Sequence, residues 1–347
     1  MKKKMLAALA ALVAAAGAFA QDFPAYFKMS GTVITGCDKD EIPDDLVIPD
    51  GVTEIGEAVF AECMYLESVV IPDSVTKIGE GAFKGSTSLK SVTLPDGVTE
   101  IGENAFSNCA SLESIRIPEG ITVIRDGAFE KCTSLVSVTI PGNVKTISST
   151  DSTKSIHDAL GAFQGCSSLK SVVIPEGVET IGTNAFADCA SLANVTIPNS
   201  VTKIGDGAFR YCKSLEGITI PDSVKEIGDV AFSGSGLKTV TIPKSVKEIG
   251  ERLFSWCKSL ESVTIPRGVT GIGYEAFIWC ESLKSVSVPR SVTKIGDGAF
   301  MNCYNLTVQF DGTKAQWEAI EKGRSLNGVG AFAVKCTDGE FGKQRWS

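Results

Sequence analysis

Residues 91–112 read SVTLPDGVTEIGENAFSNCASL, and close copies of this stretch fill most of the chain. Each copy carries a proline after an apolar residue, and most of these prolines recur 23 residues apart: Pro49, Pro72, Pro95, Pro118, Pro141, Pro175, Pro198, Pro221, Pro243, Pro266 and Pro289. A fixed period of about 20 to 50 residues is typical of proteins built from stacked structural units. The repeat therefore predicts a solenoid, in which each coil packs only on its neighbours.

The pattern within one copy predicts how a coil folds. Residues 91–94 alternate polar and apolar, as in a half-buried strand, and Pro95 ends the strand because it has no N–H to donate. Val98 and Ile101 indicate a second inward-facing extended run, and Gly102 ends it. An acidic residue should then begin a short helical turn. We therefore expect an α/β solenoid of about eleven coils over residues 46–306.

A single coil should not fold alone. Its roughly eight inward apolar groups supply about 1.5–3 kcal/mol each, whereas ordering each of its backbone units costs about 1–2 kcal/mol. The ends of the stack should consequently be capped, and residues 21–45 and 307–347 depart from the period. In the second segment Thr313 and the residues after it have capping-box spacing, which predicts a helix with Trp317 and Ile320 on one face.

The first 20 residues have the features of a cleaved secretory signal peptide. Lys2-Lys3-Lys4 precedes an apolar stretch, and Ala18-Phe19-Ala20 resembles a cleavage site. The next residue is Gln21 rather than a cysteine, so no lipoprotein anchor is indicated, and no later stretch is apolar enough to span a membrane. We expect a secreted, cell-surface or periplasmic protein.

Charge argues against a nucleic-acid partner. The chain has a formal net charge of −8, and removal of the three signal-peptide lysines leaves 30 basic residues against 41 acidic ones. Nucleic-acid binding requires clustered lysine and arginine, which an acidic repeat does not supply.

Nine of the eleven cysteines share one repeat position, three residues after the repeat phenylalanine: Cys63, Cys109, Cys132, Cys166, Cys189, Cys212, Cys257, Cys280 and Cys303. Equivalent positions of adjacent coils lie about 4.7–4.9 Å apart, whereas a disulfide needs Cβ atoms about 3.8 Å apart. Ser86 and Ser235 fill this position in the other two coils. We therefore expect buried free thiols, with redox or metal chemistry as the alternative. Cys37 and Cys336 lie outside the register.

These motifs resemble those of the BspA-type leucine-rich-repeat family of bacterial surface proteins. The resemblance rests on the core L-x-x-V-x-I-P (Leu89, Val92, Leu94 and Pro95), the stretch V-x-x-I-G-x-x-A-F and the terminal Cys336-Thr337-Asp338-Gly339. It implies a right-handed solenoid and a surface-exposed or secreted protein. Family members are described as adhesins for host matrix proteins or other bacteria, and no catalytic residue or cofactor is shared among them.

Positions that break the repeat are the candidates for specific function. The largest break is an eleven-residue insertion within 148–161. Loops that protrude from a rigid scaffold often bind partners, and they also tolerate insertions at small energetic cost. The insertion is therefore either neutral or a contact loop with these candidate residues: Thr150, Asp151, Lys154 and His157.

A second break lies two residues after the repeat phenylalanine, where Tyr211, Trp256 and Trp279 occur. Trp256 and Trp279 belong to consecutive coils, so we expect their rings to stack. Exposed aromatic clusters are frequent in binding hot spots. The candidate surface includes neighbouring residues Ile278, Met301 and Tyr304. The alternative is that the indole rings lie flat over the short helices as local packing.

A third break is a change of charge directly after the proline. Acidic residues occupy this position in most early coils, and Lys244, Arg267 and Arg290 replace them toward the C-terminal end. We expect these cations beside the tryptophan pair, where they would complete one contact region. The alternative is a solvated turn.

The sequence contains no nucleophile elbow, phosphate-binding loop or dinucleotide fingerprint, and it has one histidine. We therefore expect no enzyme, no cofactor and no metal site. The leading hypothesis is an extracellular, adhesin-like protein that binds host matrix or bacterial surface proteins. The alternative hypothesis is an envelope scaffold that self-associates through the same surface.

Overall fold

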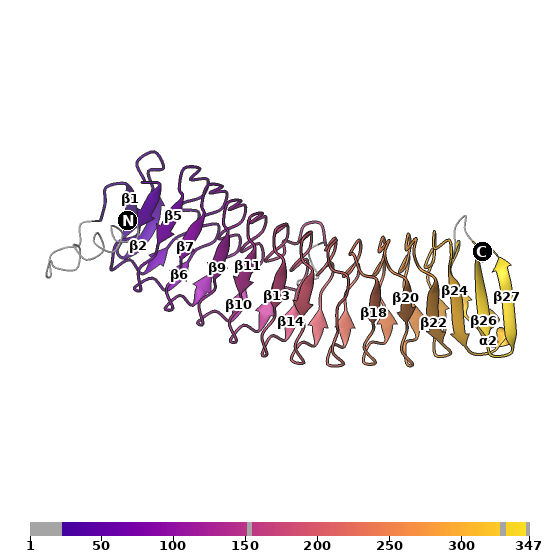
Figure 1. Cartoon of the computed structure of the whole chain (residues 1–347). Coiled ribbons are helices and arrows are strands. Elements are labelled where there is room, and N and C mark those ends of the chain that lie inside the picture. Colours follow the sequence, from indigo (N-terminus) through magenta and orange to yellow (C-terminus); the bar gives the residue numbers. More distant parts are fainter. Residues whose placement is uncertain (1–22, 151–154, 327–330, 345–347) are drawn as a thin grey trace.

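The computed structural model describes residues 23–150, 155–326 and 331–344. The chain winds into an elongated, curved stack of coils, with its two ends at opposite ends of the stack (Figure 1). The expected signal peptide, residues 1–20, lies outside the described residues. Within the described ranges, no helix has the length and apolar character that crossing a membrane requires.

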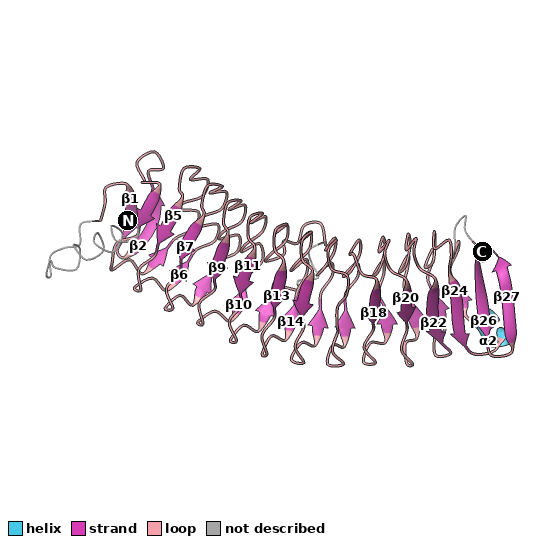
Figure 2. Cartoon of the chain, viewed as in Figure 1, coloured by secondary structure: helices cyan, strands magenta, loops and turns pink. Residues whose placement is uncertain are grey.

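Most coils contribute two short strands that run in opposite directions (Figure 2), and equivalent strands of neighbouring coils pair in parallel within several separate sheets. The coil of Pro221 has only an isolated bridge, from Thr219 to Thr241, in place of its first strand. The strands before the repeat proline form the first ladder: β3 (Asp45–Val47), β5 (Ser68–Val70), β7 (Ser91–Thr93), β9 (Ser114–Arg116), β11 (Ser137–Thr139), β13 (Ser171–Val173), β15 (Asn194–Thr196), β18 (Thr239–Thr241), β20 (Ser262–Thr264), β22 (Ser285–Pro289), β24 (Thr307–Asp311) and β26 (Phe332–Cys336). The strands after it form the second ladder: β2 (Val33–Cys37), β4 (Glu54–Ile55), β6 (Lys77–Ile78), β8 (Glu100–Ile101), β10 (Val123–Ile124), β12 (Thr146–Ile147), β14 (Thr180–Ile181), β16 (Lys203–Ile204), β17 (Glu226–Ile227), β19 (Glu248–Ile249), β21 (Gly271–Ile272), β23 (Lys294–Ile295) and β25 (Glu321–Lys322).

The core is a set of columns in which identical side chains lie above one another. In the second ladder isoleucine faces isoleucine from coil to coil, as in the pairing of Ile181 with Ile204. The eleven repeat phenylalanines, from Phe60 to Phe300, are all fully buried. Their rings form one continuous stack, with centroids 5.1 Å apart at the start and 5.8 Å between Phe232 and Phe254. Each coil therefore completes the core of the next, as expected for a solenoid.

The expected α/β class is wrong, because the structure is almost entirely strand and turn. Among the described residues the only helix is α2 (Lys314–Ala319). The segment expected to form a helical turn has left-handed residues four positions apart, such as Asn104 (φ 55°) and Asn108 (φ 58°), and a right-handed helix cannot contain them. The Phe106 N–H donates to the Ala128 carbonyl of the next coil, not to a carbonyl of its own turn.

The terminal segments depart from the parallel arrangement. β1 (Phe27–Ser30) runs antiparallel to β2, and β27 (Gly339–Gln344) runs antiparallel to β26. The predicted helix after Thr313 is confirmed as α2. The Thr313 hydroxyl accepts a hydrogen bond from the Gln316 N–H, the Gln316 side chain accepts one from the Thr313 N–H, and Trp317 and Ile320 are buried.

A column of glycines at the end of the second-ladder strands lets neighbouring coils approach closely. A Cβ on Gly205 would lie 2.7 Å from the carbonyl carbon of Gly182 in the preceding coil. The second ladder is interrupted between β8 and β10. At that point Arg125 stands in the glycine position. Arg125 alone does not explain the interruption, because the ladder also breaks between β17 and β19, where Gly250 holds this position, and it continues from β12 to β14, where Ser148 holds it.

Candidate functional site

The column two residues after the repeat phenylalanine has a left-handed backbone in every coil. Glycine, asparagine or aspartate, which favour this conformation, occupy six of its positions: Gly85, Asn108, Gly165, Asp188, Gly234 and Asn302. Tyr211, Trp256 and Trp279 adopt it too, with φ of 58°, 62° and 61°. Their N–H groups donate to carbonyls of the next coil, at 2.7–2.9 Å, which holds the backbone in place. The fold therefore imposes a strained conformation on these three aromatic residues.

The three aromatic residues form a strip along one edge of the stack. The Trp256 and Trp279 rings are stacked, with centroids 5.0 Å apart and an interplanar angle of 21°, which confirms the prediction that they stack. The Tyr211 ring extends over Gly234 of the next coil, because a Cβ on Gly234 would lie 2.3 Å from that ring. The strip thus spans four coils. Trp256 is 45% exposed and Tyr211 39% exposed, whereas Trp279 is half-buried.

Two cations that the sequence analysis did not select lie against this strip. The Lys258 ammonium lies 5.5 Å from the centre of the Trp256 ring and forms an ion pair of 2.9 Å with Glu281. The Arg210 guanidinium lies 5.1 Å from the centre of the Tyr211 ring. Both residues are within two positions of their aromatic partner in sequence. This proximity was the signal that could have identified them.

The other three candidates for this surface differ in how far they are buried. Ile278 is buried in the core, so it offers no surface for a partner. Met301 is half-buried, and Tyr304 is 42% exposed one coil beyond Trp279. We name the strip formed by Tyr211, Trp256 and Trp279 the aromatic strip.

The structure does not place the three predicted cations beside the tryptophan pair. Lys244, Arg267 and Arg290 are exposed in the turns that connect the first ladder to the second. The two strands of a coil run in opposite directions, so these turns and the aromatic strip lie at opposite edges of the stack (Figure 1). Arg267 forms an ion pair of 3.2 Å with Asp311, beside a hollow of about 440 Å³.

The insertion is described in part. Asp151 and Lys154 lie outside the described residues, whereas His157 is exposed. Thr150 is exposed and contributes to a hollow of about 390 Å³ on the second-ladder face, where Lys203, Lys225 and Lys247 also lie. Within the described ranges, no contact joins His157 to the aromatic strip.

Asn184 fixes the end of the insertion. Its side-chain amide donates to the carbonyls of Ile156 (2.7 Å) and Ala159 (2.8 Å), and its backbone is left-handed with φ of 53°. Asn184 is fully buried. The amide thus compensates carbonyl groups that the inserted segment would otherwise leave unbonded.

We expect Asn184→Gly to loosen residues 155–160 without unfolding the stack. Glycine retains the left-handed conformation, but two hydrogen bonds to buried or half-buried carbonyls are lost, at a cost of about 1–3 kcal/mol. Hydrogen–deuterium exchange should increase in this segment by about tenfold or more and stay unchanged in distant coils. Equal exchange in the variant and the parent would contradict this role.

The in-register thiols are free and hydrogen-bonded to the neighbouring coil. All eleven cysteines are free, and the nine in register are buried. Each thiol from Cys109 to Cys303 donates to a phenylalanine carbonyl of the preceding coil, at 3.1–3.2 Å. Ser86 makes the same bond to Phe60 at 2.7 Å, which explains why serine can replace cysteine here. Burial raises the pKa of Cys109 to about 12 and that of Cys257 to about 11, so these thiols stay protonated.

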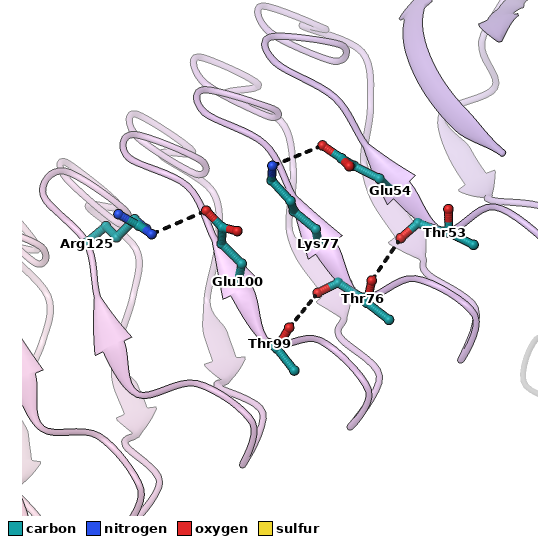
Figure 3. Close-up of polar contacts among 7 residues, drawn as sticks. All are labelled: Thr53, Glu54, Thr76, Lys77, Thr99, Glu100 and Arg125. Atoms are coloured by element: carbon teal, nitrogen blue, oxygen red, sulfur yellow. Dashed lines mark hydrogen bonds and ion pairs between the residues drawn. The ribbon is translucent and has the colours of Figure 1, made fainter. Parts of the chain in front are cut away.

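The outer face of the second ladder carries a regular polar lattice (Figure 3). The Thr76 hydroxyl donates to the Thr53 carbonyl, and the Thr99 hydroxyl donates to the Thr76 carbonyl, both at 3.3 Å. Lys77 pairs with Glu54 at 3.3 Å, and Arg125 pairs with Glu100 at 3.3 Å. Such exposed pairs are worth little energy, so this face is a solvated surface. No three metal-ligating side chains come together in the part of the chain that the structure describes.

Comparisons with known proteins agree with this architecture. The model of the BspA type leucine rich repeat region matches residues 53–157, 149–260 and 179–307. A leucine rich cell surface protein from Faecalibacterium prausnitzii is 32% identical, with 89% of this chain and 99% of that chain covered and a TM-score of 0.51. A leucine-rich repeat protein from Bacteroides ovatus is 29% identical, with 88% and 90% covered and a TM-score of 0.62.

A leucine-rich repeat protein from Eubacterium ventriosum is 28% identical, with 79% of this chain and 82% of that chain covered and a TM-score of 0.53. No curated protein matches the chain. The family model covers more than half of the sequence, and the matched ranges lie within the stack of coils. The chain therefore belongs to the BspA-type leucine-rich-repeat family.

Proposed function

We propose that this protein is a non-enzymatic, adhesin-like binding protein that recognises host matrix or bacterial surface proteins through the aromatic strip. The observation that carries the proposal is the left-handed backbone of Tyr211, Trp256 and Trp279. A bulky residue in this conformation costs about 1 kcal/mol relative to glycine, which other coils use at the same position. Tyr211 and Trp256 are exposed, so they gain little from burial in return for this cost. We infer that the aromatic side chains are retained for binding and not for folding.

The chemistry of the strip suits a protein surface. Tryptophan and tyrosine present large rigid areas that are frequent among binding hot spots, and Lys258 and Arg210 add positive charge beside them. A location outside the cytoplasm is supported by the signal-like residues 1–20 and by the similar cell surface protein of Faecalibacterium prausnitzii.

The double variant Trp256→Asn with Trp279→Asn tests the proposal. Asparagine favours the left-handed conformation and already occupies this column at Asn108 and Asn302, so the fold should be retained or slightly stabilised. Binding to immobilised matrix proteins such as collagen, or to intact bacterial cells, should weaken by at least about tenfold, as expected for loss of two hot-spot residues.

The matched control is Tyr65→Asn, which removes an aromatic residue that is 82% exposed and far from the strip. Binding by the control should equal that of the parent. If the double variant binds as well as the parent, the strip is not the contact surface. Sedimentation over a range of concentrations tests the competing scaffold function, because self-association through the strip would disappear in the double variant.

A further inference from the structure

The stack contains one interface at which neither ladder is paired. The first ladder is interrupted between β7 and β9 and the second between β8 and β10, and both gaps separate the coil of Pro95 from the coil of Pro118. Three other gaps exist, but each affects one ladder alone, because β12 still pairs with β14, β16 with β17, and Thr219 with Thr241. Among the described coils, only this interface lacks strand pairing on both faces.

Backbone hydrogen bonds that recur in other coils are also missing at this interface. At the next interface along the stack, the Lys145 N–H donates to the Thr122 carbonyl at 2.8 Å. The Ser148 N–H there donates to the Ile124 carbonyl at 2.9 Å. The equivalent N–H groups at the interface without pairing are those of Thr122 and Arg125, and neither donates to a described residue. The second-ladder faces of the two coils are therefore not joined by these bonds.

Two ion pairs bridge the same interface, one beside each ladder. Arg116, on β9, pairs with Asp96 at 2.5 Å, and Arg125, directly after β10, pairs with Glu100 at 3.3 Å (Figure 3). Both arginines belong to the coil of Pro118, and the preceding coil has threonine and glycine at these two positions. Side-chain contacts thus connect the coils where strand pairing is absent.

The edge that carries the aromatic strip in later coils is intact at this interface. The N–H groups of Asn104, Phe106 and Asn108 donate to carbonyls of the next coil at 3.0, 2.8 and 2.6 Å. Toward the first ladder the connection weakens, because the bond from the Glu113 N–H to the Lys90 carbonyl is 3.4 Å long. The two coils are therefore held along one edge and left unpaired on both faces, which is the arrangement of a hinge.

We propose that the stack bends at this interface, which we name the joint, and that the pairs Arg116–Asp96 and Arg125–Glu100 hold the joint closed. The three coils before the joint then tilt as one unit relative to the coils that carry the aromatic strip. All four charged side chains are at least 40% exposed, so dissolved salt screens both pairs. Bending should consequently increase with ionic strength.

Spin labels on the second-ladder face measure the bending by double electron–electron resonance. Thr76→Cys with Glu179→Cys spans the joint. Thr122→Cys with Lys225→Cys is the matched pair, because it also spans four coils and the insertion but follows one continuous sheet, from β10 to β17. All four positions are exposed. The labels of each pair should lie about 19 Å apart.

The distance distribution should be wider across the joint than in the matched pair. With about 10 Å of coil between the intact edge and the labels, a tilt of about 15° changes their separation by about 3 Å. Cys37 and Cys336 are replaced by serine in every labelled protein, because half-buried thiols can take up label. The nine thiols in register are buried and stay in place.

Removal of the two ion pairs should open the joint further. Asp96→Asn with Glu100→Gln, or about 1 M NaCl, should raise the population of the bent form about two- to tenfold, because each exposed pair contributes weakly. Glu54→Gln is the matched control. It removes the pair between Lys77 and Glu54, also 3.3 Å long, at an interface where β4 and β6 are paired, and it should leave the distribution unchanged.

Amide exchange on the unaltered chain provides an independent measurement. The amides of Thr122 and Arg125 should exchange at least about tenfold faster than those of Lys145 and Ser148, which are bonded to the preceding coil. Equal exchange at these two sets of amides, or equal widths for the two label pairs in high salt, would overturn the joint. A wide distribution that neither salt nor the double variant alters would show that the ion pairs do not hold the joint closed.

Discussion

Replacement of Phe186 by alanine is expected to lower the free energy of unfolding by about 3–5 kcal/mol. The ring is fully buried and stacks between Phe163, at 5.4 Å, and Phe209, at 5.6 Å. Its removal leaves a cavity that faces both neighbouring coils. In a solenoid the stability depends on the interfaces between adjacent coils, so this cavity weakens two interfaces at the middle of the stack.

Urea unfolding followed by circular dichroism measures this effect. The urea concentration at the midpoint of unfolding should fall markedly. The transition should also broaden or split, because the N-terminal and C-terminal halves of the stack become less strongly coupled. The control is Val173→Ala, at a side chain that is 69% exposed on the outer face of β13, and it should change stability by less than about 0.5 kcal/mol. Equal midpoints for the two variants would show that the phenylalanine stack does not couple the coils.

Gly205→Ala is the second change with a large expected effect. It should lower the free energy of unfolding by about 1–3 kcal/mol or more. The new Cβ would lie 2.7 Å from the Gly182 carbonyl carbon and 2.8 Å from the Thr183 nitrogen. Both contacts are with backbone, which cannot move aside as a side chain can. The two coils must therefore separate, and the hydrogen bond of 2.7 Å from the Gly205 N–H to the Ile181 carbonyl is strained or lost.

Gly142→Ala is the matched control, because a Cβ on Gly142 would meet nothing within 4 Å and its backbone is not left-handed. Thermal unfolding of both variants compares a closely packed glycine with an unhindered one. The control should unfold at the parent temperature or slightly higher, since alanine restricts the unfolded chain. A Gly205→Ala protein as stable as the control would refute the close-packing explanation for this column.

The sequence predicted those features that depend on spacing along the chain. The proline period predicted the stack, the capping-box spacing at Thr313 predicted α2, and the positions of Trp256 and Trp279 in consecutive coils predicted their stacking. Each of these follows from local pattern or from equivalence between repeats, which a sequence displays directly.

The features that were missed depend on contacts between coils or on backbone conformation. The glycine before the turn was interpreted as a break in the strand, and its role in close approach becomes visible only when one coil lies on another. The α/β class was wrong because alternate N–H groups in this segment, such as that of Phe106, donate to the next coil. The N–H groups between them, such as that of Ala105, make bonds within single turns, so no continuous helix forms. The sequence analysis expected the cations beside the tryptophans because the two groups are close in sequence: Lys244, Arg267 and Arg290. A coil has two opposite edges, so residues that are close in sequence can lie far apart.

The thiol column gives the molecule a built-in reporter of local opening. A thiol that donates to a carbonyl of the adjacent coil, as Cys189 does to Phe163, is shielded from alkylating reagents while the two coils stay together. Its modification therefore records how often that pair of coils separates. Such thiols occur from Cys109 to Cys303. Their rates of alkylation would therefore show how often each pair of coils opens, from frequent opening near the two ends of the stack to rare opening at its centre.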